Sequence, residues 1–327
     1  MTGVRKTAVV LSAALASFAC HPDADDEPLA PPPGSEPAKA AEQAGPPEAL
    51  SENAISVGDA VITVEYDGRE LALPEEVLEA WVERSAGIVR AYLGEFPVPS
   101  LEITLVGRGF GGVGFGMHQD GRWITVYCGR RISNEGLEND WVMIHEMLHA
   151  AFPDLRRDHR WMQEGLSTYL EPIVRARAAE YPEAEVWRRW TRSMHHGRPK
   201  SGDRGLDITH TWGRTYWGGA LFWLAVDVEL RKRTNNEKSI RDIVRGILAE
   251  GGNGRANWST RKVVEVGDAA TGTTVLAETY AAMAEAPGDV DLTALYADLG
   301  VVRQDDGTVV FDDSAPLAHI RRAITRK

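Results

Sequence analysis

The stretch "WVMIHEMLHAAFP", residues 141–153, decides how this chain is interpreted. His145 and His149 are four residues apart, and Glu146 directly follows the first histidine. On a helix this spacing places both imidazoles on one side, where they can reach a single ion such as zinc. Glu146 then points beside the ion, where a carboxylate can take a proton from water. A chance HExxH is expected in about 1% of chains of this length.

Signals at both ends of this stretch predict a helix. Asn139 or Asp140 can cap its start, and Pro153 stops it. The apolar spacing predicts one buried face, made of Trp141, Ile144, Leu148 and Ala151.

A catalytic zinc site needs a third protein ligand and one open position for water. The HExxHxxGxxH pattern does not apply, because Phe152 and Leu155 stand where it requires glycine and histidine. His159 lies in a polar turn that does not fix its side chain. Glu164 is the better candidate, because it begins a second apolar-periodic helix that can hold it against the first.

HExxH followed by "WMQEGLSTYLE", residues 161–171, resembles the gluzincin metallopeptidases. This resemblance implies that His145, His149 and Glu164 bind one Zn²⁺ ion and that Glu146 is the general base. Only 14 residues separate His149 from Glu164. This short connection is similar to that of the compact MA-like peptidases, which are found in exported bacterial proteins.

A second acid follows in the same segment. Glu171 matches a position that is also acidic in the aminopeptidase branch. The resemblance implies that Glu171 contacts the metal ligands without binding the metal itself. The alternative is a solvated helix residue next to Pro172.

The downstream segment "HTWGRTYWGGALFWLAV", residues 210–226, resembles the helix that the glycyl-aminopeptidase branch places after its site. Tyr216 and Gly219 hold the places of its Tyr-x-x-Gly, although Gly218 replaces the usual lysine. The resemblance implies that the Tyr216 hydroxyl stabilises the oxyanion. The alternatives are a tyrosine packed in the core and His210 as the donor. The histidines of "MHHG", residues 194–197, are interpreted as loop residues.

This sequence departs from one motif of the aminopeptidases. The aminopeptidases carry Gly-x-Met-Glu-Asn here, and the acid of that motif binds the amino group of the substrate. In this sequence Met117 is followed by His118 instead of Glu, and Asp120 is the remaining acid that could substitute. Exopeptidase or endopeptidase action is therefore left open. The strand "RWITVYC", residues 122–128, is expected to be an edge that pairs with an extended peptide.

The order of elements predicts an α+β fold. A hairpin is expected over residues 60–74 with its turn at Asp67-Gly68, then a helix from Pro74 to Gly94. Strands follow at residues 101–106 and 122–128, joined by a glycine-rich link that lacks the features of a phosphate loop. Beyond Asn139 nearly everything reads as helix. The resemblance implies a thermolysin-like gluzincin domain with a small mixed sheet and a helical second half.

The first twenty residues read as an export signal, with Arg5 and Lys6 before an apolar run at residues 7–18. The ending "SFAC" resembles a bacterial lipoprotein signal, which implies lipidation of Cys20 and a membrane anchor in the cell envelope. The alternative is ordinary secretion with Cys20 unmodified. If Cys20 is acylated, Cys128 has no intramolecular partner, and its apolar strand predicts that it is buried.

Residues 21–53 are predicted to be a disordered tether, because eight of the 17 prolines gather there with Ala and Glu. Residues 54–327 are expected to form the metallopeptidase domain. Residues 54–172 would hold the sheet and zinc site, and residues 173–327 the helices. The carboxy-terminal part is predicted to be helices around a short strand at "TVVF", residues 308–311.

The net charge of -12 argues against a nucleic-acid partner, which would require a basic face. The expected function is zinc-dependent hydrolysis of peptide bonds in a peptide or protein substrate. The alternatives are an inactive envelope lipoprotein that binds a peptide or protein, and a hydrolase of another amide or ester. The oligomeric state is not readable from the sequence.

Overall fold

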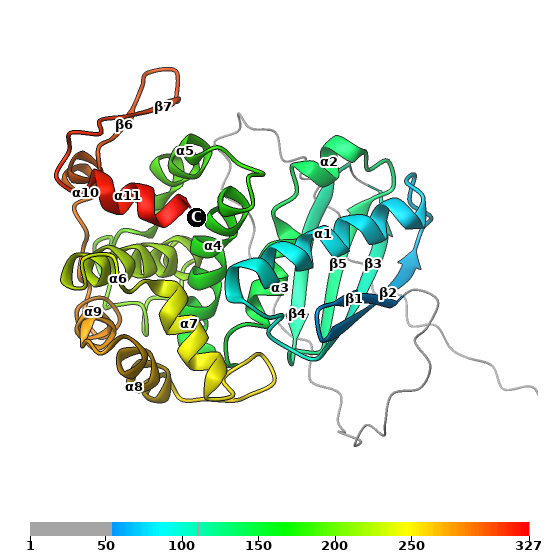
Figure 1. Cartoon of the computed structure of the whole chain (residues 1–327), viewed down its shortest axis with the longest axis horizontal. Helices are drawn as coiled ribbons and strands as arrows, with labels where there is room; N and C mark the ends of the chain where they lie inside the picture. The colour runs from blue at the N-terminus through cyan, green and yellow to red at the C-terminus, as the bar shows by residue number, and fades with distance from the viewer. Residues whose placement is uncertain (1–53, 110, 327) are drawn as a thin grey trace, which may run out of the picture.

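The computed structural model of the chain describes residues 54–109 and 111–326 (Figure 1). The predicted export signal, the lipid attachment at Cys20 and the tether lie outside these residues. Within the described part, no helix is both long and apolar enough to cross a membrane. Cys128 is buried and is not in a disulfide.

A five-stranded mixed sheet forms the first half, in the order β1-β2-β3-β5-β4. The strands are β1 (Ala54–Val57), β2 (Ala60–Gly68), β3 (Ser100–Arg108), β4 (Val113–Gln119) and β5 (Trp123–Gly129). The central strands β2, β3 and β5 run parallel, whereas β1 and β4 pair antiparallel at the two edges.

Helix α1 (Glu75–Leu93) connects β2 to β3 and crosses one face of the sheet (Figure 1). It begins after Pro74 and ends at Gly94, as predicted. Gly94 adopts a φ of 101°, a conformation that L side chains rarely take. Alternate strand residues, such as Ile62 and Ile103, are fully buried on the face that the helices cover.

The predicted hairpin at Asp67-Gly68 is wrong. The hairpin is instead β1–β2, with its turn at Gly58-Asp59. Beyond the turn, β2 takes β3 as its second neighbour, in parallel, with Gly68 opposite Gly107. Because both sides of β2 are occupied, the apolar run after Gly68 finds no place in the sheet and leads into α1.

The predicted edge strand is also wrong. The strand at residues 122–128 is β5, which lies between β3 and β4. Part of the predicted glycine-rich link is β4, the true edge. Its glycines weaken the strand pattern in the sequence, and Gly116 is needed because the strand passes very close to another element, as shown below.

The chain after β5 is mostly helical, as predicted for the residues beyond Asn139. It contains α2 (Asn134–Glu138), α3 (Val142–His149), η1 (Arg157–His159), α4 (Arg160–Arg177), α5 (Glu183–Ser193), η2 (Met194–Gly197), η3 (Arg214–Gly218), α6 (Gly219–Arg233), α7 (Ile240–Ala249), α8 (Thr260–Thr271), α9 (Val275–Met283), α10 (Leu292–Leu299) and α11 (Ala318–Thr325). The predicted strand at residues 308–311 is β7 (Val309–Phe311), which pairs with β6 (Val301–Arg303) in a two-stranded sheet.

Helices α3 and α4 join the two halves. Helix α3 packs against α1, β4 and α4, and α4 packs against α6 (Figure 1). The buried apolar side chains of sheet and helices form one continuous cluster. The predicted division between Pro172 and Ile173 falls inside α4, and the division itself stays a prediction.

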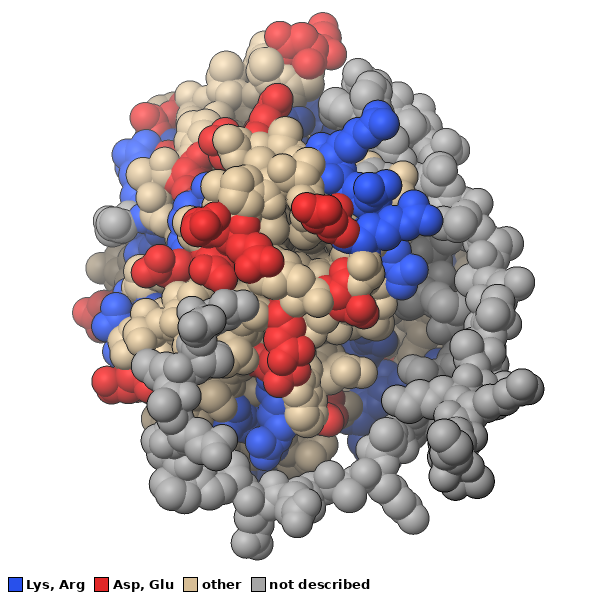
Figure 2. All heavy atoms as spheres, turned by 90° about the vertical axis from the view of Figure 1, so that its right-hand side faces the viewer, with Lys and Arg blue, Asp and Glu red and all other residues tan. Residues whose placement is uncertain are grey.

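Acidic and basic side chains share the face shown in Figure 2, which views the sheet end of the molecule. Asp and Glu gather in the middle of this face, and Lys and Arg lie toward its margins. The expectation that no nucleic acid binds stays a prediction.

Candidate metal centre

Asp140 caps helix α3. Its carboxylate oxygens accept the backbone N–H groups of Val142 at 2.7 Å and Met143 at 3.1 Å. These are two of the donors that a helix start leaves without partners. Burial raises the pKa of Asp140 to about 7, although the two backbone hydrogen bonds oppose the shift.

The prediction that Trp141 belongs to the buried face of α3 is wrong. Its side chain is 43% exposed, whereas Ile144, Leu148 and Ala151 are buried as predicted. Trp141 precedes His145 by four residues, so it lies in the row of the two histidines rather than on the apolar face.

The three predicted ligands come together. The Nε2 atoms of His145 and His149 lie 3.2 Å and 3.4 Å from Oε2 of Glu164. One ligand atom from each residue lies within 4.8 Å of the others, and all three side chains are buried. Two imidazoles and a carboxylate form the donor set that zinc takes in catalytic sites. The residues therefore fit a zinc ion.

Two glycines bring α4 and α6 into close contact at this site. A Cβ atom on Gly165 would lie 2.3 Å from Cα of Gly219, and one on Gly219 would lie 2.2 Å from the carbonyl oxygen of Trp161. The glycines of both sequence motifs therefore have a physical reason, since no larger residue fits the crossing. The crossing places Glu164 near Tyr216.

Arg160 was missed by the sequence analysis. From one turn earlier on α4, its Nε and Nη2 atoms contact Oε1 of Glu164 at 2.9 Å and 2.8 Å. The i, i+4 spacing of an arginine and a glutamate on a predicted helix was the available signal. Burial alone would raise the pKa of Glu164, but His149 and His145 hold it well below its usual value.

Glu171 is buried, so it is not the solvated helix residue of the alternative interpretation. Its carboxylate pairs with Arg175 at 3.5 Å and with Arg189 at 3.4 Å. Burial raises its pKa, against the opposing charges of Arg189 and Arg175. Nearby, Ser167 Oγ lies 3.3 Å from Nδ1 of His149 and so can orient that ring.

Glu146 lies directly under the edge strand β4. A Cβ atom on Gly116 would approach Cγ of Glu146 to 2.4 Å, so only glycine leaves the Glu146 side chain in this position. The Glu146 side chain is 7% exposed, and burial raises its pKa. A carboxylate beside the candidate metal group and under the sheet edge is placed to act on a backbone that lies along β4.

His118, where the aminopeptidases carry an acid, also lies at the site. Its ring centroid is 5.8 Å from that of His149. Burial and His149 lower its pKa to about 3, so the imidazole is neutral at neutral pH. A neutral ring offers no negative charge to a substrate amine. Asp120, the remaining acid, lies in the exposed turn after β4.

Tyr216 lies beside His145, with 6.3 Å between the ring centroids. It belongs to η3, a π-helical segment that continues directly into α6, and the Tyr-x-x-Gly resemblance implied a helix at this place. Burial raises the pKa of Tyr216, and the charge of Glu164 adds to this shift, so the hydroxyl keeps its proton. His210, the rival donor, contacts the backbone oxygen of Asp207 at 2.9 Å.

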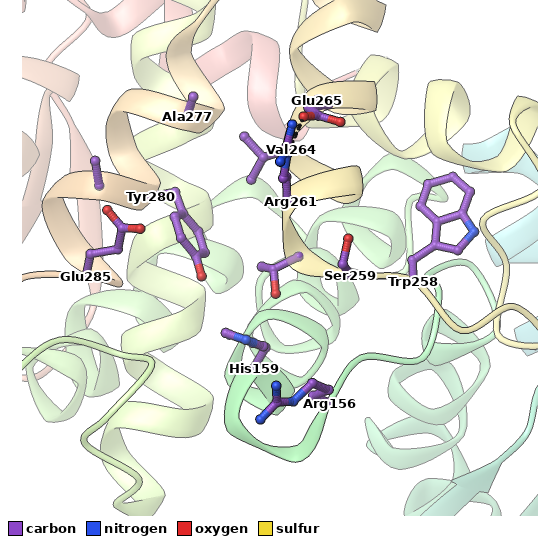
Figure 3. A pocket seen from close by; sticks show the side chains of 12 residues that line it. Arg156, His159, Trp258, Ser259, Arg261, Val264, Glu265, Ala277, Tyr280 and Glu285 are labelled. Atoms are coloured by element: carbon purple, nitrogen blue, oxygen red, sulfur yellow. Dashed lines mark hydrogen bonds and ion pairs between the residues drawn. The ribbon is translucent and has the colours of Figure 1, made fainter.

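His159, the alternative ligand, points elsewhere. Its Nδ1 atom lies 2.8 Å from Oδ1 of Asp207, which also accepts the indole N–H of Trp161 at 2.9 Å. With Tyr280 it lines a separate cavity of about 620 Å³ (Figure 3). The histidines of η2 are also outside the metal group.

Similar folds are found among solved structures but not from the sequence alone. No family model and no curated protein matches the sequence. An aminopeptidase N family protein from Idiomarina loihiensis is similar in structure, with a TM-score of 0.60 and 14% identity over 80% of this chain and 52% of that chain. An M1 zinc metallopeptidase from Deinococcus radiodurans gives 0.49 and 15% over 72% and 53%.

A third structure, yeast LTA4 hydrolase, gives a TM-score of 0.47 and 13% identity over 75% of this chain and 41% of that chain. The first of these similarities shows that this chain shares a fold with part of the aminopeptidase N family protein. The chain spans about half the length of that structure.

Proposed function

We propose that this protein is a zinc-dependent peptidase. The observation that carries the proposal is the arrangement of Glu146. Its buried carboxylate lies beside a group of two imidazoles and a carboxylate and under a sheet edge that can hold a peptide. A binding module has no use for a second carboxylate at this position, whereas hydrolysis requires one as a base.

Each residue has a separate task in the proposed reaction. The zinc would be held by His145, His149 and Glu164. When bound, it would act as a Lewis acid that polarises the carbonyl and activates water. The Glu146 carboxylate takes the proton from the attacking water and delivers it to the leaving nitrogen. The Tyr216 hydroxyl donates a hydrogen bond to the carbonyl oxygen as negative charge develops there.

The substrate backbone would pair with the outer edge of β4. Among the described strands only β5 pairs with β4, so the other side of β4 can take an extended peptide. With Gly116 over Glu146, a peptide bond in that position lies next to the base. The neutral His118 gives the substrate amine no carboxylate, which favours cleavage within a peptide over removal of its first residue.

The test compares residues 54–327 of the protein with its Glu146→Gln variant on a mixed peptide library. New termini are mapped by mass spectrometry, and zinc content is measured in both proteins. We expect internal cuts by the unmutated protein only, with zinc bound to both. Release of single amino-terminal residues would instead establish aminopeptidase action. Equal results from two zinc-loaded proteins would favour the inactive peptide-binding lipoprotein or a hydrolase of another substrate.

We also propose that the protein is exported and anchored to the bacterial cell envelope through lipid on Cys20. The support is the sequence alone. Growth of an expressing bacterium with labelled palmitate tests it, because the full-length chain should take up label and its Cys20→Ser variant should not. An unlabelled but exported protein would establish ordinary secretion.

A further inference from the structure

A second cavity lies apart from the candidate metal group (Figure 3). It has a volume of about 620 Å³ and lies between the segment that precedes α4 and helices α8 and α9. His145, His149 and Glu164 do not line it. Cavities of a few hundred Å³ are the usual size of small-molecule sites. This cavity is therefore a candidate binding site in its own right.

Asp207 fixes two of the side chains that line the cavity. Its Oδ1 atom lies 2.8 Å from Nδ1 of His159 and accepts the indole N–H of Trp161 at 2.9 Å. Its Oδ2 atom accepts the hydroxyl of Tyr280. Because Nδ1 of His159 faces Asp207, Nε2 is the ring nitrogen that is left for a ligand. The position of the ring is thus set before any ligand binds, which lowers the cost of binding.

Hydrogen-bond donors gather at one end of the cavity. Arg156 and His159 belong to one turn, in which the N–H of His159 donates to the carbonyl oxygen of Arg156 at 2.8 Å, and Figure 3 shows both side chains at the same end. The Arg156 guanidinium contacts Asp158 through Nη2 at 2.9 Å, which leaves most of its N–H groups for a ligand. A protonated His159 ring also donates from Nε2. A carboxylate is the group that fits these donors.

A carboxylate lies away from these donors. Glu285 follows α9, is exposed, and lies beside Tyr280 in Figure 3. Burial and Asp207 raise the pKa of Tyr280, and the charge of Glu285 adds to this shift, so the two side chains are close enough to interact. Among the described residues no cation pairs with Glu285, whereas Glu265, the other acid of the lining, pairs with Arg261 at 2.7 Å. Glu285 can therefore pair with an ammonium group of a ligand.

The wall toward α8 and α9 is apolar. It is formed by Val264 of α8 and by Ala277 and Ala281 of α9. Val264 and Ala277 are half-buried, and Ala281 is exposed. Alanines leave room beside them, so an apolar group of a ligand can cover this wall and leave water. The cavity therefore offers donors to an anion, a carboxylate to a cation and an apolar surface beside them.

We propose that this cavity binds a zwitterion with an apolar side chain: a free amino acid or a short peptide. Its carboxylate contacts Arg156 and His159, its ammonium group pairs with Glu285, and its side chain covers the alanines of α9. In a free amino acid both charged groups share one carbon atom, whereas an extended peptide separates them by about 3.4 Å per residue. The length of the ligand therefore distinguishes the two sources. The site goes beyond the proposed peptidase function and does not depend on it.

Calorimetric titration with leucine and with leucyl-leucine tests the site. The protein is the full-length, zinc-loaded Glu146→Gln variant, in which the dipeptide should not be cleaved. The tighter of the two probes is then compared with its N-acetylated form, which lacks the ammonium group, and with its amide, which lacks the carboxylate. We expect each of these to bind about tenfold more weakly than the probe. Tighter binding of leucine would assign the site to free amino acids, and tighter binding of the dipeptide to short peptides.

Variants of the lining assign each end of the cavity. Glu285→Gln should weaken binding of the probe about tenfold and leave binding of its N-acetylated form unchanged. Arg156→Gln should weaken binding of the probe and leave binding of its amide unchanged. Ala281→Trp, which fills the cavity, should abolish binding of all three. Glu237→Gln is the matched control, because Glu237 is an exposed acid outside the cavity and its replacement should change nothing.

Absence of binding, or binding that the variants of the lining leave unchanged, would overturn the inference. Binding that is lost in Glu164→Ala but kept in Ala281→Trp would place the probe at the candidate metal group and would overturn it as well. Arg156, Ala281 and Glu285 are exposed, so their replacement should leave the fold intact, and thermal unfolding checks this. Binding in the cavity of a protein that cleaves no peptide would refute the proposed function alone. Cleavage by a protein whose cavity binds neither probe would refute this inference alone.

Discussion

Arg160 and Glu164 are joined through a single oxygen. Two guanidinium nitrogens of Arg160 contact Oε1, while Oε2 faces Nε2 of His145 and of His149. The carboxylate thus divides its oxygens, one toward the arginine and one toward the candidate metal position. A ligand fixed in this way presents one oxygen and leaves another position open, which a catalytic metal site requires.

Arg160→Gln should weaken zinc binding about tenfold, because Glu164 loses the group that orients it. Competition with a chromophoric chelator measures the affinity. Arg160→Lys keeps the charge but not the two-point contact. Its zinc affinity should lie between those of the unmutated protein and Arg160→Gln. Arg156→Gln is the control, since Arg156 lies in the preceding turn and pairs only with the exposed Asp158 at 2.9 Å. Stronger binding by Arg160→Gln would show that charge repulsion outweighs orientation.

Removal of zinc should destabilise the folded protein. Zinc at 100 times its dissociation constant adds about 2.7 kcal/mol to the free energy of unfolding, if the unfolded chain does not bind it. For a domain of this size that is a fall in Tm of roughly 5–10 °C on adding a chelator. Thermal unfolding with and without zinc measures it.

Two variants separate the candidate ligands in the same measurement. Glu164→Ala should lose the zinc-dependent rise in Tm, and His159→Asn should keep it. The reverse outcome would make His159 the third ligand, against its position on Asp207.

The sequence predicted the candidate site better than it predicted the sheet. Helical spacing fixes which side chains share a face, so it placed His145 beside His149. The resemblance to gluzincins added Glu164 from the second helix. Trp141 was misplaced because its spacing fits two rows, 141–144–148 and 141–145–149. Only the packing of α3 against the sheet decides between them.

The sheet could not be predicted because its errors concern neighbours far apart in the sequence. Whether β2 pairs with the segment after it or with β3 depends on which edge is already taken, and no local pattern records this. Strand β4 was missed because Gly116 removes the side chain that would signal a strand. That glycine is required by the approach of Glu146 from α3, 30 residues later. Arg160 was readable from its spacing to Glu164.

Tyr216→Phe should lower kcat about 100-fold and leave KM little changed, because the hydroxyl would act on charge that develops in the transition state. Steady-state kinetics on a cleaved peptide measure both constants. Tyr280→Phe is the matched control, since the Tyr280 hydroxyl is held by Asp207 beside the other cavity. A larger KM with unchanged kcat would assign Tyr216 to substrate binding only.

Arg175 links α4 to the segment before α3. Its side chain is 2% exposed, pairs with Glu180 at 2.8 Å and donates to the backbone oxygens of Asp140 and Glu138. Arg175→Ala should lower the free energy of unfolding by about 3–5 kcal/mol, because it leaves the buried partners of Arg175, including Glu171, without this ion pair. Urea unfolding measures the change. Arg188→Ala, at a half-exposed pair with Glu185, should change it by less than about 1 kcal/mol.

Asp140 should make stability depend on pH. Its pKa is about 7 in the folded protein against a usual value of 3.8, mainly through burial. Between these values the folded state binds more protons than the unfolded state, so the contribution of Asp140 falls as pH rises from about 4 to about 7. Asp140→Asn keeps a capping oxygen and removes the titration. The free energy of unfolding of this variant, relative to that of the unmutated protein, should therefore increase from pH 5 to pH 8.

Asp140→Ala separates the cap from the charge. It loses both backbone hydrogen bonds, so it should be less stable than Asp140→Asn by about 1 kcal/mol at either pH. Urea unfolding of the three proteins at pH 5 and pH 8 gives the comparison, in which other titrating groups cancel because they are common to all three. A pH dependence identical in the Asp and Asn proteins would mean that Asp140 is ionised throughout this range. In that case its two backbone hydrogen bonds, together with Arg175, outweigh its burial.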